Sequence, residues 1–189
     1  MKSANVQAKV SVSLPTEQIL RSVIGPSYEP DNVLNVIKMM AGTEDMYPAV
    51  VGFIRALFQA RDVDPKTREM IMLRAAKVLH CPYEWEANTV LAKNVGLSDL
   101  EIEAAGSEGV VTGIHVDFVL ICRATDELSL DATLTDATLS EMLSRYGEVV
   151  SRKLILIIGW FNLLARFLNG CRVPLEDFEK LDKRSDPLA

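Results

Sequence analysis

The sequence predicts an all-α fold, and three observations support this prediction. Apolar residues recur at three- and four-residue spacings from residue 32 to about residue 169, and no segment shows strong period-two alternation. Helix start and stop signals separate these periodic segments. Hydrophobic residues make up 49% of the 189 residues and charged residues 24%, which provides a substantial core for one domain.

The N-terminal part is expected to be irregular at first and helical afterwards. Residues 1–31 contain three prolines and a glycine, so we expect an arm with at most one short helix near residues 16–23. Asp31 is placed to cap a helix over residues 32–41. A wide apolar stripe then predicts a helix over residues 46–60.

A pair of consecutive helices has the clearest signals. Asp64 is a good N-cap residue, and Pro65 suits the first helical position, so a helix is expected from there to Leu79. Pro82 cannot sit comfortably inside a helix. We therefore expect a break before it and a new helix over residues 82–94, with a glycine at 96 as its stop.

Four further helices are expected after this pair. The first opens with the capping-box pattern Ser98-Asp99-Leu100-Glu101. Their expected ranges are 98–106, 114–129, 135–145 and 148–169. With these elements, the chain divides into an arm (1–31), a helical domain (32–178) and a charged tail (179–189).

Two segments of the chain resemble each other. The run Arg68–Leu73 (REMIML) is similar to Arg152–Ile157 (RKLILI). This similarity is compatible with an internal duplication of a helical hairpin, and equally with two core helices of similar composition.

Composition and cysteine usage narrow the class of protein. The formal net charge is −6, which argues against a nucleic-acid partner. Three widely spaced cysteines do not indicate a disulfide framework, so a reducing, cytoplasmic location is expected. The most apolar run, 154–168, is shorter than the ~20 residues that span a bilayer, so we expect a core helix and no membrane partner.

The break at Pro82 defines a candidate site. With Cys81 as the N-cap, Glu84 and Asn88 fall on the same helix face as Cys81, and that face continues with apolar residues. Polar groups at one end of a core-facing stripe indicate the mouth of a buried pocket. The helix N-terminus carries partial positive charge, which favours a thiolate at Cys81 and can hold a substrate carboxylate. Glu69, on the preceding helix, can reach the same place and act with Glu84 in acid–base chemistry.

Each of these residues also has a structural interpretation. Glu84 occupies a usual capping position, Cys81 can be a small buried apolar residue, and Asn88 can satisfy a neighbouring backbone group. Tyr83 and Trp85 can simply pack in the core. No His-x-x-x-His or Cys-x-x-Cys spacing is present, so no metal site and no cofactor are expected.

The same stretch resembles a known superfamily. The similarity rests on Arg68-Glu69, Leu73-Arg74, Tyr83-Glu84-Trp85 and Gly96-Leu97-Ser98, with weaker support elsewhere in residues 30–178. These motifs resemble the carboxymuconolactone decarboxylase and AhpD-like superfamily, of which this chain looks like a longer member without the Cys-x-x-Cys motif. The resemblance implies an AhpD-like bundle of antiparallel helical hairpins and a homo-oligomer (dimer, trimer or hexamer).

The resemblance also implies roles for individual residues. The peroxidase branch of this superfamily has Glu, Cys, Cys and His where this chain has Glu69, Cys81, Glu84 and Asn88. Without the second thiol, a dithiol–disulfide cycle is not expected. The decarboxylase-like branch has Glu at position 84 and usually His at position 88, and Asn cannot titrate near neutral pH. The expected catalytic residues are Glu69, Cys81, Glu84 and Asn88, and the expected substrate-binding residues are His80, Tyr83 and Trp85.

These observations lead to one functional prediction and two alternatives. The prediction is a carboxymuconolactone decarboxylase-like lyase that transfers a proton on a small carboxylated or lactone-type substrate without a cofactor. The first alternative is a catalytically silent, oligomeric ligand-binding protein on the same scaffold. The second is a one-cysteine hydroperoxidase that uses Cys81.

Overall fold

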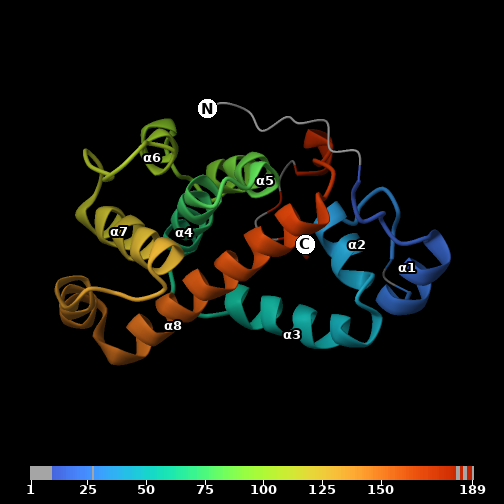
Figure 1. The fold of residues 1–189 in the computed structure, drawn as a ribbon, viewed down its shortest axis with the longest axis horizontal. Coiled ribbons are helices and arrows are strands. Elements are labelled where there is room, and N and C mark those ends of the chain that lie inside the picture. Colours follow the sequence, from blue (N-terminus) through green and yellow to red (C-terminus); the bar gives the residue numbers. More distant parts are fainter. Residues whose placement is uncertain (1–9, 27, 182–183, 185–186, 189) are drawn as a thin grey trace.

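The computed structural model describes residues 10–26, 28–181, 184 and 187–188. This part of the chain contains eight α-helices, two short 3-10 helices and no strand, which confirms the all-α fold (Figure 1). The α-helices are α1 (Glu17–Ile24), α2 (Asn35–Ala41), α3 (Tyr47–Phe58), α4 (Pro65–Val78), α5 (Pro82–Asn94), α6 (Asp99–Ala105), α7 (Val116–Leu130) and α8 (Asp136–Cys171). The 3-10 helices are η1 (Glu44–Met46) and η2 (Phe178–Lys180).

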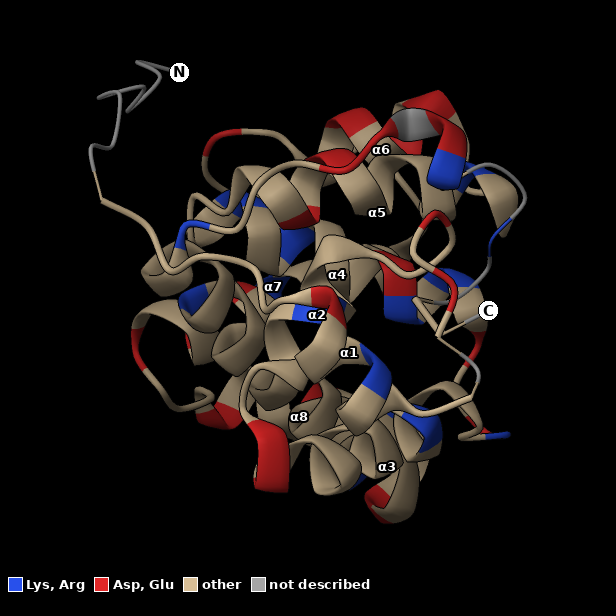
Figure 2. Cartoon of the chain, turned by 90° about the vertical axis from the view of Figure 1, so that its right-hand side faces the viewer, with Lys and Arg blue, Asp and Glu red and all other residues tan. Residues whose placement is uncertain are grey.

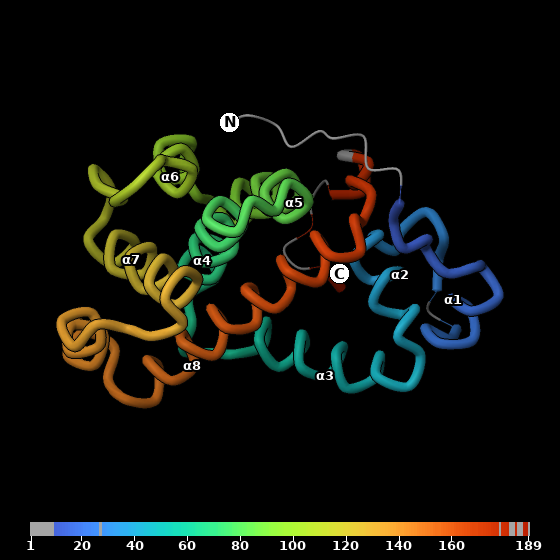
Figure 3. Tube along the Cα trace, in the orientation of Figure 1, coloured from blue at the N-terminus to red at the C-terminus, as the bar shows by residue number. Residues whose placement is uncertain are grey.

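Helix α4 lies at the centre of the fold. As predicted, the Asp64 carboxylate caps it by accepting the Lys66 N–H at 2.7 Å. Nine consecutive residues, Arg68–Ala76, are buried, because α4 contacts α5, α6, α7 and α8 (Figure 3). A helix that is covered on all sides has no polar face, so its sequence shows little amphipathic pattern.

Helix α8 consists of two helical parts joined at Gly147. That glycine has φ 71° and ψ 173°, a conformation that L residues with a side chain rarely adopt. The break agrees with the two predicted helices, 135–145 and 148–169. The second part runs across the molecule (Figure 1) and buries Ile158 and Phe161 almost completely.

The length and composition of α8 also meet the criteria for a membrane-crossing helix. Its most apolar 18-residue window has a mean hydropathy of 1.6, but half of that window is buried inside the fold. Since the core helix of a soluble protein meets the same criteria, this is weak support for a membrane span. We interpret α8 as a core helix, in line with the sequence prediction.

The predicted start of the second helix is wrong. Helix α2 begins at Asn35 and not at residue 32, and its N-cap is Leu34, with an extended backbone (ψ 152°), rather than Asp31. The N–H groups of Asn32 and Val33 both donate to the carbonyl of Glu29, which holds these residues in a turn. Because these two N–H groups bond within the turn, helix α2 starts after them.

Both ends of the described chain pack on the helical body. Helix α1 contacts α2, and Leu20 is 2% exposed. At the other end, Leu181 is 1% exposed, and its carbonyl accepts a hydrogen bond from Asn94 of α5. The domain limits at residues 31 and 178 remain predictions. The internal duplication also remains a prediction, because α4 and α8 would have similar core compositions with or without a duplication.

Most charged residues of the described chain are exposed, and Figure 2 shows Lys and Arg positions interspersed with Asp and Glu positions along the chain, but Arg74 is buried. Its guanidinium donates to the Asp126 carboxylate (Nη2–Oδ2, 2.7 Å) and to the carbonyls of Ala105, Ser107 and Gly109. This ion pair joins α4, α7 and the segment after α6. It stabilises the packing around α4 because every donor of the charged group has an acceptor.

Candidate active site

The turn between α4 and α5 has the geometry of a left-handed helix cap. His80 has φ 51°, and the next N–H, of Cys81, donates to the carbonyl of Ala76 at 2.9 Å. Cys81 is the N-cap of α5, and Pro82 is its first residue, as the sequence predicts. The break therefore places Glu84 and Asn88 on the face of α5 that turns toward the core.

A small cavity lies between α2, α3, α4, α5 and α8. Its volume is about 30 Å³, room for one or two water molecules. Four lining residues carry a polar side-chain nitrogen or oxygen: Tyr83, Glu84, Asn88 and, through its indole nitrogen, Trp160. The other lining residues are apolar: Leu34, Val36, Ile37, Met40, Ile54, Phe58, Met72, Ala87, Leu91, Phe161, Leu164 and Pro187.

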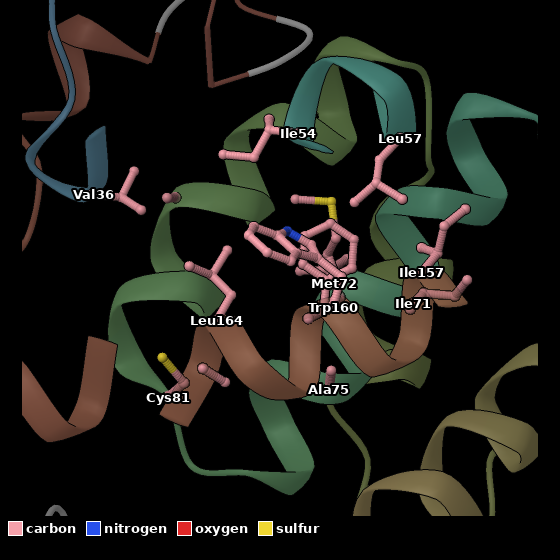
Figure 4. Close-up of a cluster of buried hydrophobic side chains, with 14 of the residues drawn as sticks. Val36, Ile54, Leu57, Ile71, Met72, Ala75, Cys81, Ile157, Trp160 and Leu164 are labelled. Carbon is pink, nitrogen blue, oxygen red and sulfur yellow. The ribbon is translucent and has the colours of Figure 1, made fainter. Parts of the chain in front are cut away.

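The apolar wall of the cavity includes two methionines, Met40 and Met72. Figure 4 shows Met72 of α4 and Trp160 of α8 within the buried cluster beside the cavity. Methionine side chains have several accessible rotamers and adapt to neighbouring shapes. Met40 and Met72 are therefore the lining residues whose side chains can most readily change rotamer around a small ligand.

Glu84 and Asn88 form the polar end of the cavity. Each is 4% exposed, and Asn88 Nδ2 donates to Glu84 Oε2 at 2.8 Å. Burial raises the pKa of Glu84 to about 8, although the hydrogen bond from Asn88 acts in the opposite direction. At pH 7 this carboxyl is therefore mainly protonated and can donate a proton, while its ionised fraction can accept one.

The expectation of a thiolate at Cys81 is wrong. The side chain is 1% exposed and lies in the apolar cluster, where Figure 4 also shows Leu164. Burial raises the pKa of the Cys81 thiol to about 12, the charge of Glu84 adds to this rise, and the backbone N–H groups of α5 only partly oppose it. Desolvation thus exceeds the effect of the helix N-terminus.

Glu69 is completely buried but does not line the cavity. It lies one turn before Met72 on α4, and its Oε1 is 3.8 Å from Arg68 Nε. The guanidinium of Arg68 lies over the ring of Phe58, 4.2 Å from the ring centroid. The pair thus lies near the cavity wall, with the phenyl ring of Phe58 next to the cation.

The three predicted substrate-binding residues have different surroundings. The ring of Tyr83 lines the cavity, while its hydroxyl accepts the Val36 N–H at 3.0 Å and donates to the Glu176 carboxylate. Trp85 faces α6, because a Cβ atom on Gly106 would lie 2.6 Å from its ring. His80 is exposed at the turn and does not line the cavity.

The structure thus brings Tyr83, Glu84 and Asn88 together at one cavity, while Glu69, Cys81, His80 and Trp85 lie outside its lining. Among the described residues, no group of three or more His, Cys, Asp or Glu side chains could hold a metal ion. The arrangement provides a titratable carboxyl, an amide donor and a space screened from water.

A comparison with models of protein families gives a match that includes the α4–α5 pair. Residues 44–113 match the carboxymuconolactone decarboxylase family. The match confirms the resemblance to the carboxymuconolactone decarboxylase and AhpD-like superfamily over this segment, which runs from η1 to the loop before α7. A search of curated proteins found no match to the chain.

Several cavity residues lie outside the segment that matches the carboxymuconolactone decarboxylase family. Trp160 and Phe161 come from α8, Met40 from α2 and Pro187 from the C-terminal segment. No spacing rule relates them to Glu84, because tertiary packing alone brings them together. Sequence reasoning had no signal for them beyond their apolar character.

Proposed function

We propose that the protein is a carboxymuconolactone decarboxylase-like enzyme that transfers a proton on a small lactone-type or carboxylated molecule without a metal or organic cofactor. The observation that carries the proposal is the buried carboxyl of Glu84, with its pKa raised to about 8, at the polar end of an apolar cavity. General acids and bases are most effective when their pKa lies near the working pH.

The proposed step uses the two protonation states of Glu84 in turn. The ionised carboxylate accepts a proton from the carbon next to the substrate carbonyl, and the electrons of that C–H bond move toward the carbonyl oxygen. Asn88 stabilises the resulting enolate through an N–H of its amide. The protonated Glu84 then returns the proton to another carbon of the same conjugated system, which restores the carbonyl and regenerates the base.

The surroundings of Cys81, Glu69 and Asn88 give less support for a catalytic role than those of Glu84. A thiol with a pKa of about 12 is a poor nucleophile at neutral pH, which weighs against the one-cysteine hydroperoxidase. Glu69 is paired with Arg68 outside the lining, so we propose Glu84 rather than Glu69 as the base. Asn88, in place of the family's usual histidine, keeps the silent ligand-binding protein as the second candidate.

A hydrogen-exchange experiment separates the two candidates. The protein is incubated in D₂O with small unsaturated lactones such as α-angelica lactone, and deuterium incorporation is followed by NMR. Exchange faster than in buffer alone supports the enzyme, and Glu84→Gln is expected to slow it by about 10²- to 10⁴-fold. Glu86→Gln is the control, since Glu86 is half-buried on the same helix and does not line the cavity.

Two results would contradict the enzyme assignment. Exchange no faster than in buffer for every lactone favours the silent binding protein. Exchange that survives Glu84→Gln within a few-fold shows that another group is the base.

We also propose that the protein acts as a homo-oligomer, in the cytoplasm. The support for an oligomer is the outer face of α8, where Leu156 and Leu163 are 54% and 55% exposed and Gly159 lies between them. Exposed leucines one heptad apart, separated by a glycine, allow a helix of another subunit to approach closely.

A further inference from the structure

The charge around the cavity points to a particular class of substrate. None of the sixteen described lining residues is Lys, Arg or His. The lining holds one acid, Glu84, and a second acid, Glu176, bonds to the hydroxyl of the lining residue Tyr83. Arg68, a cation next to the lining residue Phe58, lies over the Phe58 ring and has its Nε 3.8 Å from the Glu69 carboxylate.

A carboxylate ligand would therefore lose its hydration without gaining a counter-charge. Burying an ionised carboxylate is strongly unfavourable unless a cation or several donors compensate it. Its charge would also lie close to Glu84 and would oppose ionisation of the proposed base. Both effects weaken the binding of a carboxylate, and neither weakens the binding of its uncharged ester.

The polar groups present match an uncharged carbonyl oxygen instead. Asn88 Nδ2 carries two hydrogens, and one of them bonds to Glu84 Oε2. The second hydrogen and the hydroxyl of protonated Glu84 are the two donors that this polar pair offers to a ligand acceptor. A carbonyl oxygen has two lone pairs, so it can accept from both, while the carbon skeleton lies among Met72, Phe161 and Trp160.

We propose that this cavity selects small, uncharged carbonyl compounds, namely neutral lactones and their esters, over the corresponding carboxylates. The inference rests on the proposed function for its site, but it concerns binding and can be measured without turnover.

The test compares two ligands that differ by one charge, 4-carboxymethyl-but-2-enolide and its methyl ester. Binding is followed at pH 7 through the fluorescence of Trp160 in a Trp85→Phe protein, where it is the only tryptophan. The ester is expected to bind at least about tenfold more tightly than the acid. Asn88→Ala is expected to weaken ester binding about tenfold, whereas the control Glu86→Gln leaves it unchanged.

A second variant tests the charge argument itself. Pro187 lines the cavity from the C-terminal segment and is only half-buried, so Pro187→Arg adds a cation at little cost to folding. This change is expected to improve binding of the acid and to reduce the preference for the ester. Acid binding as tight as ester binding in the parent protein, or no binding of either ligand at about 10 mM, overturns the inference.

The two proposals fail in different ways. Selective ester binding without any deuterium exchange leaves the inference standing and removes the enzyme. Deuterium exchange of lactones together with tight binding of the acid supports the enzyme and overturns the inference about substrate charge.

Discussion

The protonation of Glu84 can be tested through folding stability, without any substrate. The perturbation is Glu84→Gln, which keeps the size of the side chain and an oxygen that can accept from Asn88. Gln cannot ionise, so it imitates the protonated carboxyl at every pH. The quantity of interest is the difference in the free energy of unfolding between the variant and the parent protein as a function of pH.

The sign and size of this difference follow from the pKa of Glu84, which is raised from 4.5 to about 8 in the folded protein. Below about pH 4.5 both the folded and the unfolded chain hold the proton, so the two proteins should differ little. Between about pH 4.5 and 8 the unfolded chain releases the proton and the folded one keeps it, which destabilises the parent by about 1.4 kcal/mol per pH unit. Above about pH 8 the loss levels off at roughly 5 kcal/mol, and the variant does not suffer it.

The assay is urea denaturation of both proteins, followed by circular dichroism at several values between pH 5 and 9. Because other groups titrate equally in the two proteins, their effects cancel in the difference. The variant should gain stability over the parent as the pH rises, and Glu86→Gln should show no comparable gain. A difference that stays constant within about 1 kcal/mol from pH 5 to 8 would show that Glu84 is ionised in the fold, and the general-base argument would lose its main support.

Three further predictions concern other parts of the fold. Arg74→Ala removes the buried partner of an ion pair whose carboxylate, Asp126, is 22% exposed, and should lower the free energy of unfolding in urea by about 3 kcal/mol; a loss below about 1 kcal/mol would show that the pair is not important for stability. Cys171 should be the only thiol of the native protein that reacts quickly with Ellman's reagent at pH 8, because burial raises the pKa values of the other two to about 12; a fast thiol in Cys171→Ser protein would contradict the burial of Cys81. Replacing both Leu156 and Leu163 by Glu should reduce the mass measured by light scattering, and an unchanged oligomer would place the contact elsewhere.

The α4–α5 hairpin could be predicted from sequence because its signals are local. Asp64 and Pro65 start one helix, Pro82 starts the next, and the i, i+4 spacing of Glu84 and Asn88 places both on one face. The hydrogen bond between these two side chains agrees with that spacing.

Properties that depend on distant parts of the chain could not be predicted in this way. The start of α2 is delayed by a turn whose residue Asn32 also bonds to Arg184, near the other end of the chain. The ionisation of Cys81 depends on its burial in the core, where it is 1% exposed. The local rule of a helix N-terminus predicted a thiolate, because burial by remote residues does not enter that rule.

The origin of the cavity wall has a consequence for how such proteins can diverge. Half of its lining residues lie within residues 44–113, together with the acid and the amide, and half come from α2, α8 and the C-terminal segment. Substitutions in the outer half can reshape the space around a bound molecule while the acid–amide pair stays unchanged. Relatives that share the matched segment can therefore share a reaction and still differ in the molecules they accept.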